Sequence, residues 1–87
     1  MPNESLKVRI ITPRKVIFED QALSVSSTNS SGKFDILPEH ANFITIVENQ
    51  TITIRIRNKR RLTFSFPLAI IYNINNMVNI YTDISIK

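Results

Sequence analysis

Residues 51–66 read TITIRIRNKRRLTFSF, and their apolar side chains fall at every second position on either side of a basic centre. Successive side chains of a β-strand point to opposite faces of its sheet, so this period of two predicts two strands, each with one buried face. Isoleucine and phenylalanine, which favour strands, dominate the apolar positions. The expected buried faces consist of Ile52, Ile54, Ile56, Leu62, Phe64 and Phe66.

The register of these two strands follows from the rule that cross-strand partners point to the same face. We predict that Ile56 pairs with Leu62, which leaves residues 58–60 as a loop and sets Arg57 opposite Arg61. A like-charge pair beside a basic loop mildly destabilises a hairpin, so one interpretation is contact with an anion or an acidic protein surface. We prefer the other interpretation, a solvated tip that guards an edge strand. Five of the eleven basic residues form this tip: Arg55, Arg57, Lys59, Arg60 and Arg61.

The same alternation continues toward both ends of the chain. Strands are expected over 68–74 and 77–86, joined at Asn75 and Asn76, which tolerate the positive φ of a tight primed turn. The polar segment 26–32, SSTNSSG, predicts a mobile loop. Further strands are expected near residues 6–10, 16–18, 23–25, 34–36 and 43–47. No window has a helical period with caps. The prediction is therefore an all-β, two-sheet sandwich of about eight to ten short, mostly antiparallel strands.

Length and composition limit the class of protein. Eighty-seven residues fit a single domain spanning 1–87, and 43% apolar with 21% charged residues is typical of a folded domain. The absence of cysteine excludes disulfides and thiolate metal sites, and it favours an intracellular compartment. The N-terminus lacks the pattern of a secretory signal, and the apolar runs are too short to span a membrane.

Catalysis needs a nucleophile with a base, a carboxylate pair or a metal cluster, and the sequence shows none of these in a recognisable arrangement. The one histidine, His40, has no serine and carboxylate placed beside it, so we interpret it as a structural turn residue. Asp35 and Glu39 flank it, but one histidine without cysteine makes a zinc site improbable. We predict no enzymatic activity, no cofactor and no metal.

The net charge of +4 raises an alternative function, a small basic β domain that binds single-stranded nucleic acid. Such a domain interleaves arginines with exposed aromatic rings on which bases stack. Here Phe64 and Phe66 share the expected inward face with Leu62, and the arginines lie outward or at the tip. Tyr72 and Tyr81 are far along the chain from the basic cluster, so we do not expect nucleic acid as a partner.

The segment GKFDILPEHAN, residues 32–42, holds the only glycine and the only histidine of the chain. Together with LKVRIITPRKVIF (6–18), the serine-rich stretch, the basic hairpin and MVNIYTD (77–83), it resembles the N-terminal β-sandwich domain of the epsilon subunit of F-type ATP synthases, called delta in mitochondria. The resemblance covers about residues 6–83. The matching signature positions are Gly32, Phe34, Ile36, Leu37, Pro38, His40, Ala41 and Thr45.

The resemblance implies a non-catalytic rotor part of the central stalk that helps to couple ion translocation to ATP synthesis and hydrolysis. It also implies a peripheral place on the cytoplasmic face of the bacterial inner membrane, in preference to an organellar inner or thylakoid membrane, with membrane contact only through the complex. Its partners would be the gamma subunit and the c-ring. The positions that match the family's c-ring loop are Ser31, Gly32 and Lys33. Those that match surfaces near gamma are Thr12, His40, Ala41, Asn42 and Phe43.

Several positions depart from the family pattern. Asp35 and Glu39 replace usual glycines, so each turn must adopt negative φ or accept strain of about 1 kcal/mol. Lys33 replaces a frequent acidic residue, which would change the charge complementarity at the ring. Most family members carry two further helices with regulatory roles, and this sequence ends at Lys87. Those roles are expected to be absent.

Overall fold

The computed structural model describes residues 5–57 and 60–83, and within these ranges the chain forms β-strands and no helix. None of the described segments is therefore a helix long and apolar enough to cross a membrane. The nine strands of the described ranges are β1 (Leu6–Ile11), β2 (Val16–Ala22), β3 (Ser24–Asn29), β4 (Gly32–Ile36), β5 (Phe43–Glu48), β6 (Thr51–Ile56), β7 (Arg60–Ser65), β8 (Leu68–Ile74) and β9 (Met77–Thr82).

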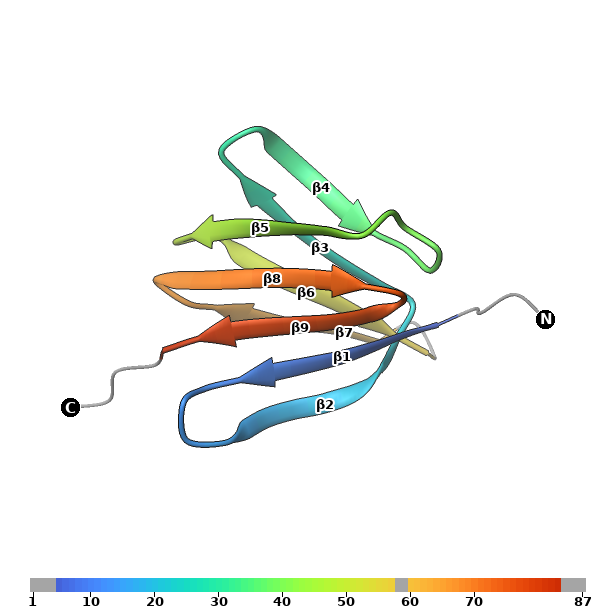
Figure 1. Ribbon diagram of the computed structural model, residues 1–87, viewed down its shortest axis with the longest axis horizontal. Helices are drawn as coiled ribbons and strands as arrows, with labels where there is room; N and C mark the ends of the chain where they lie inside the picture. Colours follow the sequence, from blue (N-terminus) through green and yellow to red (C-terminus); the bar gives the residue numbers. More distant parts are fainter. Residues whose placement is uncertain (1–4, 58–59, 84–87) are drawn as a thin grey trace.

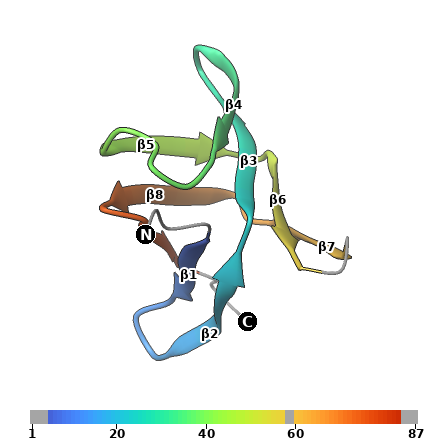
Figure 2. The ribbon, with the colours of Figure 1, turned by 90° about the vertical axis from the view of Figure 1, so that its right-hand side faces the viewer.

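The strands form two sheets packed face to face (Figures 1 and 2). The five-stranded sheet has the order β2-β1-β9-β8-β5, and the four-stranded sheet has the order β4-β3-β6-β7. Strands β1 and β9 pair in parallel, whereas the other pairings in the described ranges are antiparallel. The prediction of an all-β, mostly antiparallel sandwich is confirmed.

The core lies between the two sheets and consists of the inward side chains that the period of two predicts. Ile52 and Ile54 are fully buried, and Phe66 retains an exposed fraction of only 7%, while Ile56 and Phe64 are partly buried against the core. The buried apolar residues are Leu6, Val8, Ile10, Ala22, Val25, Ile36, Val47, Ile52, Ile54, Phe66, Ala69, Ile71, Val78 and Ile80.

Both open edges of the sandwich are closed by a pair of phenylalanines in edge-to-face contact. Phe18 of β2 and Phe64 of β7 have ring centroids 5.5 Å apart. At the opposite edge, the rings of Phe34 of β4 and Phe43 of β5 are 5.8 Å apart. Each pair links the two sheets, and such ring contacts stabilise by about 0.5–1.5 kcal/mol beyond the buried area. Aromatic contacts therefore connect the two sheets at both edges of the sandwich.

The polar segment SSTNSSG is mostly a strand, so the prediction of a mobile loop over residues 26–32 is wrong. Strand β3 continues to Asn29, and only residues 30–31 form the turn to β4. The serine side chains form hydrogen bonds within the sheet: the hydroxyl of the buried Ser27 donates to the Thr51 carbonyl at 3.0 Å. Ser26 likewise donates to the Asp35 carboxylate on the neighbouring strand. Cross-strand partners satisfy these polar groups, which composition alone does not reveal.

The predicted register of the basic hairpin is also wrong, by two residues. Ile54 pairs with Leu62 and Ile56 with Arg60, so the expected partnership of Ile56 with Leu62 does not form. The like-charge pair is Arg55 with Arg61, not Arg57 with Arg61. A shift of two keeps every side chain on its face, so alternation cannot distinguish the two registers. Residues 58–59, which include Lys59 of the predicted cluster, lie outside the described residues.

The turn between β8 and β9 has the predicted primed geometry, with φ of 50° at Asn75 and 66° at Asn76. Strand β9 ends at Thr82, whereas the predicted strand continues to residue 86. Residues 84–86 lie outside the described residues. This turn, at the right-hand end of Figure 1, lies beside the loop between β4 and β5.

Candidate functional site

The outer face of the five-stranded sheet carries large apolar side chains that no other part of the described chain covers. Their exposed fractions range from 37% to 61%. Strand register places Ile46, Ile70, Tyr81 and Ile11 in one row across four strands. Contiguous exposed apolar patches on monomeric proteins mark interaction sites. We call this surface the apolar face; it consists of Ile44, Ile46, Leu68, Ile70, Tyr72, Met77 and Tyr81.

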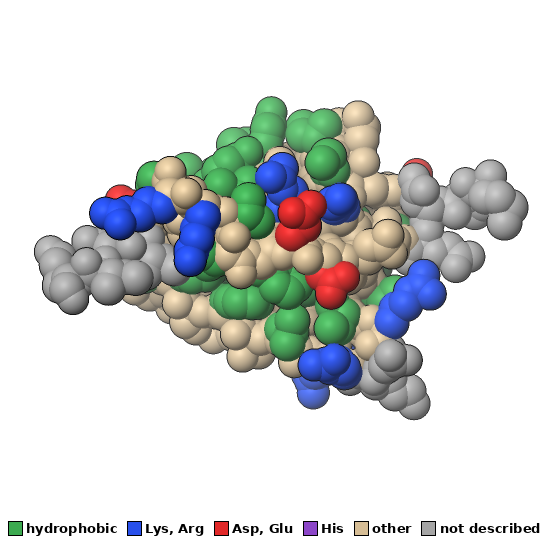
Figure 3. All heavy atoms as spheres, turned by 90° about the horizontal axis from the view of Figure 1, so that it is seen from below, with side chains coloured by type: hydrophobic (Ala, Val, Ile, Leu, Met, Phe, Trp, Pro, Cys, Tyr) green, Lys and Arg blue, Asp and Glu red, His purple; other side chains and the backbone are tan. Residues whose placement is uncertain are grey.

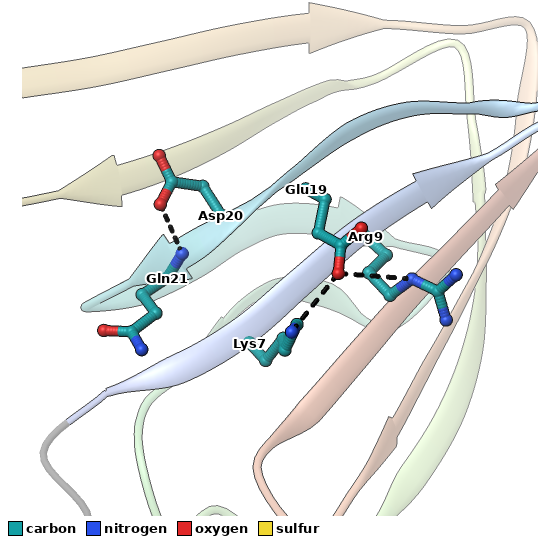
Figure 4. A network of polar contacts seen from close by, with 5 residues as sticks. All are labelled: Lys7, Arg9, Glu19, Asp20 and Gln21. Atoms are coloured by element: carbon teal, nitrogen blue, oxygen red, sulfur yellow. Dashed lines mark hydrogen bonds and ion pairs between the residues drawn. The ribbon is translucent and has the colours of Figure 1, made fainter.

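A charged strip borders the apolar face on strands β1 and β2. Glu19 lies between two cations: its Oε2 is 3.2 Å from Lys7 Nζ and 4.0 Å from Arg9 Nε (Figure 4). Arg9 is opposite Asn79, and these two residues separate Glu19 from Tyr72 in one cross-strand row. The space-filling view from below shows acidic and basic side chains side by side, with hydrophobic side chains both along the upper margin and below the charged group (Figure 3). The outer sheet face is thus apolar on one half and polar on the other.

A groove of about 520 Å³ lies at the end of the apolar face where β1 and β9 finish. Its wall includes Thr12, Pro67 and Tyr81. The Thr12 hydroxyl donates to the Lys15 carbonyl at 3.0 Å and accepts the Lys15 backbone N–H at 3.2 Å. It also accepts the N–H of Arg14 at 3.3 Å. Thr12 therefore holds the turn between β1 and β2 and forms one wall of this groove.

The loop before β5 begins with a turn that requires a left-handed residue. The N–H of His40 donates to the carbonyl of Leu37 at 3.0 Å, with Pro38 and Glu39 between them. Glu39 has φ of 69°, the conformation that glycine normally supplies at this position of a type II turn. At the two positions where the family usually has glycine, we predicted either negative φ or a strained backbone, and Glu39 has the strained conformation. Asp35 avoids it, because it lies within β4 and has no positive φ.

The predicted gamma-contact residues of this loop are tied to the turn between β8 and β9. Asn73 Nδ2 donates to the carbonyl of Ala41 at 3.0 Å, and Asn42 Oδ1 accepts the backbone N–H of Asn75 at 2.8 Å. His40 Nδ1 lies 2.7 Å from the Ala41 carbonyl, and its ring is 5.0 Å from that of Phe43. These polar contacts fix the loop conformation.

The structure brings only part of the predicted gamma-contact set together. Residues 40–43 adjoin the start of β5, at the right-hand end of Figure 1, and Thr12 follows the end of β1 at the left. Phe43 is half-buried against the core, whereas Ala41 and Asn42 are exposed. The apolar face lies between the two groups, so they flank one surface from opposite ends.

The predicted c-ring contacts form the tip of the hairpin between β3 and β4, which projects beyond the sheets at the top of Figure 2. Ser31 and Lys33 are exposed, and Gly32 has φ of 120°, so the turn requires glycine's conformational freedom. Asn29 Oδ1 accepts the N–H of Ser31 at 2.8 Å, and Asn29 Nδ2 donates to Thr45 Oγ1 at 2.8 Å. The second bond anchors the tip to the five-stranded sheet.

The predicted basic cluster is divided between two sides of the hairpin. Arg55 and Arg61 point outward from the four-stranded sheet. Arg60 pairs with Ile56, so its side chain is on the opposite face of the sheet. Arg57 follows the end of β6. The exposed Tyr72 belongs to the apolar face of the other sheet. Arg55 and Arg61 thus lie on the outer face opposite the one that carries Tyr72, and they do not form one stacking surface for nucleic acid with it.

The apolar face was not predicted, although a signal for it is present in the sequence. In β5 and β8 both alternating sets of side chains are apolar, as the segments FITIV and LAII show. A strand that is apolar on both faces is normally covered on both. Among the described residues, no group of three or more His, Cys, Asp or Glu side chains is arranged to hold a metal ion.

The chain is similar to ATP synthase epsilon chains of several organisms. The chain is 30% identical over 87 residues to the ATP synthase epsilon chain of Rickettsia felis, a match that covers 98% of this chain and 78% of the relative. It is 41% identical over 54 residues to the ATP synthase epsilon chain of Sulfurimonas denitrificans, which covers 62% of this chain and only 42% of the relative. In that match, the chain spans less than half of the relative's length.

A solved structure shows the same fold. One chain of the cryo-EM structure of the Euglena gracilis mitochondrial ATP synthase (OSCP/F1/c-ring, rotational state 1) superposes with a TM-score of 0.84 at 10% identity, over 94% of this chain and 52% of that one. The model of one family, described as the ATP synthase Delta/Epsilon chain, beta-sandwich domain, matches residues 5–87. The chain belongs to this family.

Proposed function

We propose that the protein is a non-catalytic central-stalk subunit of a rotary F-type ATP synthase that binds the gamma subunit and contacts the c-ring. The family match supports this role, and the uncovered apolar face is the structural observation that carries it. A subunit that only transmits motion needs broad contact surfaces and a stiff body, and it needs no pocket for chemistry.

The apolar face is the surface that we assign to the gamma subunit. It offers a continuous row of aliphatic and aromatic side chains, with the charged strip of Lys7, Arg9 and Glu19 along one side. Burial of apolar side chains is the main favourable term in protein association, and a charged rim fixes orientation. Thr12 and residues 40–43 flank this face at its two ends, so a partner seated on it reaches both groups.

The tip of the hairpin between β3 and β4 is the part that we assign to the c-ring. Ser31 and Lys33 are exposed there, and the bond from Asn29 to Thr45 limits bending of the tip relative to the sandwich. The phenylalanine pairs at both edges stiffen the body in the same way. In this role the subunit helps to couple ion translocation to ATP synthesis and hydrolysis. It lies at the cytoplasmic face of the bacterial inner membrane and is held there through the complex.

Binding to the cognate gamma subunit tests the assignment of the apolar face. Ile46→Lys places a charge on an exposed β5 position, and Thr63→Lys makes the same addition on an exposed position of the other sheet. We expect the first variant to weaken the complex by roughly tenfold or more, because it buries an unpaired charge, and the second to bind as the wild type does. Equal affinity of the two variants would refute this docking face.

Cross-linking tests the c-ring contact separately. The chain has no cysteine, so Ser31→Cys introduces a single thiol at the hairpin tip. In the assembled complex this thiol should cross-link to cysteines placed in the polar loops of the c-ring, whereas Thr63→Cys should not. If both variants cross-link equally, or neither does, the tip is not the ring contact.

A further inference from the structure

We propose that Arg55 and Arg61 form a binding site for a phosphate-type oxyanion on the outer face of the four-stranded sheet. This site lies on the sheet opposite the apolar face, and it does not depend on the proposed stalk function. It would take a single phosphate group, either free or carried by a nucleotide or a lipid headgroup.

The site begins with the register of the hairpin between β6 and β7. Arg55 and Arg61 are direct cross-strand partners, and Ser24 of β3 is the neighbour of Arg55 on the other side. Antiparallel partners have Cα atoms about 4.5–5.5 Å apart, so two guanidinium groups start from adjacent points on one face. Both arginines are exposed. Side chains can therefore converge on one ligand without a change in backbone.

Hydroxyl groups surround the two arginines. The next row across the sheet consists of Thr63, Thr53 and Ser26, in register. A groove of about 420 Å³ includes Arg55 and Arg61 in its lining. Its remaining wall is formed by Ser24, Ser26, Asp35, Leu37 and Thr53. The Ser26 hydroxyl donates to Asp35, so the donors for the oxygens of one anion are the two guanidinium forks and the hydroxyls of Ser24 and Thr53.

Electrostatics also favours an anion here. In the described part of the chain, ion pairs form between Glu19 and the cations Lys7 and Arg9 on the other sheet, and no carboxylate lies within 4.0 Å of the Arg55 or Arg61 guanidinium. Like charges directly opposite one another destabilise a sheet. The one carboxylate in the groove, Asp35, accepts a hydrogen bond from Ser26 and lies two strands from Arg55. An anion between the arginines would remove their repulsion.

The case for phosphate over carboxylate comes from the number and placement of donors. Two guanidinium groups and hydroxyls from β3 and β6 approach the same groove from different sides. A tetrahedral group with several acceptor oxygens can use donors from each side, whereas a planar carboxylate is satisfied by one fork. A local rule of sheet pairing is broken here without compensation in the described chain, and such positions are where function is expected.

The chain provides a matched control for this site. Arg60 precedes Arg61, carries the same charge and is also exposed, yet it faces the other side of the sheet. Arg60→Gln and Arg61→Gln therefore make the same change in net charge one residue apart. Both variants should weaken a non-specific attraction to the basic hairpin equally, whereas only Arg61→Gln should weaken binding at a defined site.

The test is a titration of the protein with inorganic phosphate at constant ionic strength, followed through the arginine Nε–H signals in NMR spectra. In the wild type, the signals of Arg55 and Arg61 should move and saturate. Arg61→Gln, and Arg55→Gln as a second variant, should bind phosphate roughly tenfold more weakly, since each removes one charge-assisted donor group. Arg60→Gln should match the wild type. Acetate at the same ionic strength should bind more weakly than phosphate.

Two further arms identify the source of the phosphate group: ATP, and vesicles of phosphatidylcholine with and without phosphatidylglycerol. Tighter binding of ATP than of free phosphate assigns the phosphate group to a nucleotide. Retention of the wild type on the anionic vesicles, with loss of that retention in Arg61→Gln, assigns it to a lipid headgroup. Comparable or stronger binding of free phosphate assigns it to the free ion. Absence of saturation with every probe, equal losses in Arg60→Gln and Arg61→Gln, or equal binding of acetate would overturn the proposal.

Discussion

Glu39 and Asn76 hold each other through two hydrogen bonds across the end of the sandwich. The backbone N–H of Glu39 donates to Asn76 Oδ1 at 2.7 Å, and Asn76 Nδ2 donates to Glu39 Oε2 at 2.9 Å. Both residues have positive φ, 69° and 66°. The side chain of a turn residue in one hairpin thus supports a strained turn in a distant loop, and this pairing fixes residues 37–42 against the turn between β8 and β9.

Two substitutions of Asn76 separate these contributions. Asn76→Gly removes both hydrogen bonds but keeps the positive φ, and we expect it to lower the free energy of unfolding by about 1–2 kcal/mol. Asn76→Ala also forces a left-handed alanine, which should add about 1 kcal/mol to the loss. Urea denaturation of the three proteins measures the order wild type, glycine, alanine. An alanine variant as stable as the glycine variant would contradict the role of φ.

Gly32→Ala should destabilise the hairpin tip through the backbone alone. An added Cβ would meet nothing within 4 Å, yet the φ of 120° is one that side chains rarely adopt. The expected loss in the free energy of unfolding is about 1–3 kcal/mol, measured by thermal or urea unfolding. Ser31→Ala, one residue earlier, is the control and should change stability by less than about 0.5 kcal/mol.

Arg61→Glu should stabilise the protein by about 0.5–1 kcal/mol, because it replaces a like-charge cross-strand pair with an opposite-charge pair. Salt should reveal the cause: added sodium chloride screens repulsion in the wild type and attraction in the variant. The difference in the free energy of unfolding should therefore shrink as salt rises. A difference that is independent of salt would show that charge is not responsible.

The two phenylalanine pairs should act independently. In a double-mutant cycle with leucine replacements, Phe18 and Phe64 should show a coupling of about 0.5–1.5 kcal/mol. Phe18 and Phe34 close opposite edges of the sandwich, so their replacements should be additive within about 0.5 kcal/mol. Unfolding free energies of the single and double variants measure both cycles. Strong coupling of Phe18 with Phe34 would mean that the edges are not separate.

The sequence allowed the faces of the strands to be predicted, but not their partners. Alternation placed Ile52 and Ile54 in the core, as the structure has them. It left the hairpin register open by two residues, since pairing Leu62 with Ile54 or with Ile56 gives the same faces. The choice depends on the whole length of β6 and on its second partner, β3, which are relationships between distant segments.

Only those residues of the candidate site that are close together in the sequence could be predicted to lie together. Residues 40–43 were expected to act together, and their shared loop brings them together. Thr12 was assigned to the same partner as these residues, yet it follows the far end of β1 and lies at the opposite end of the sheet. The apolar face consists of outward residues from several strands, such as Ile46, Ile70 and Tyr81, and only their pairing makes them neighbours.

The position of β9 has a consequence for how the protein is made. This strand lies in the middle of the five-stranded sheet, between β1 and β8, although it is the last of the described strands to leave the ribosome. Until it emerges, β1 with β2 and β8 with β5 are two separate fragments, each with an unpaired edge that can bind other nascent chains. This half of the molecule therefore cannot complete its sheet before β9 has been synthesised.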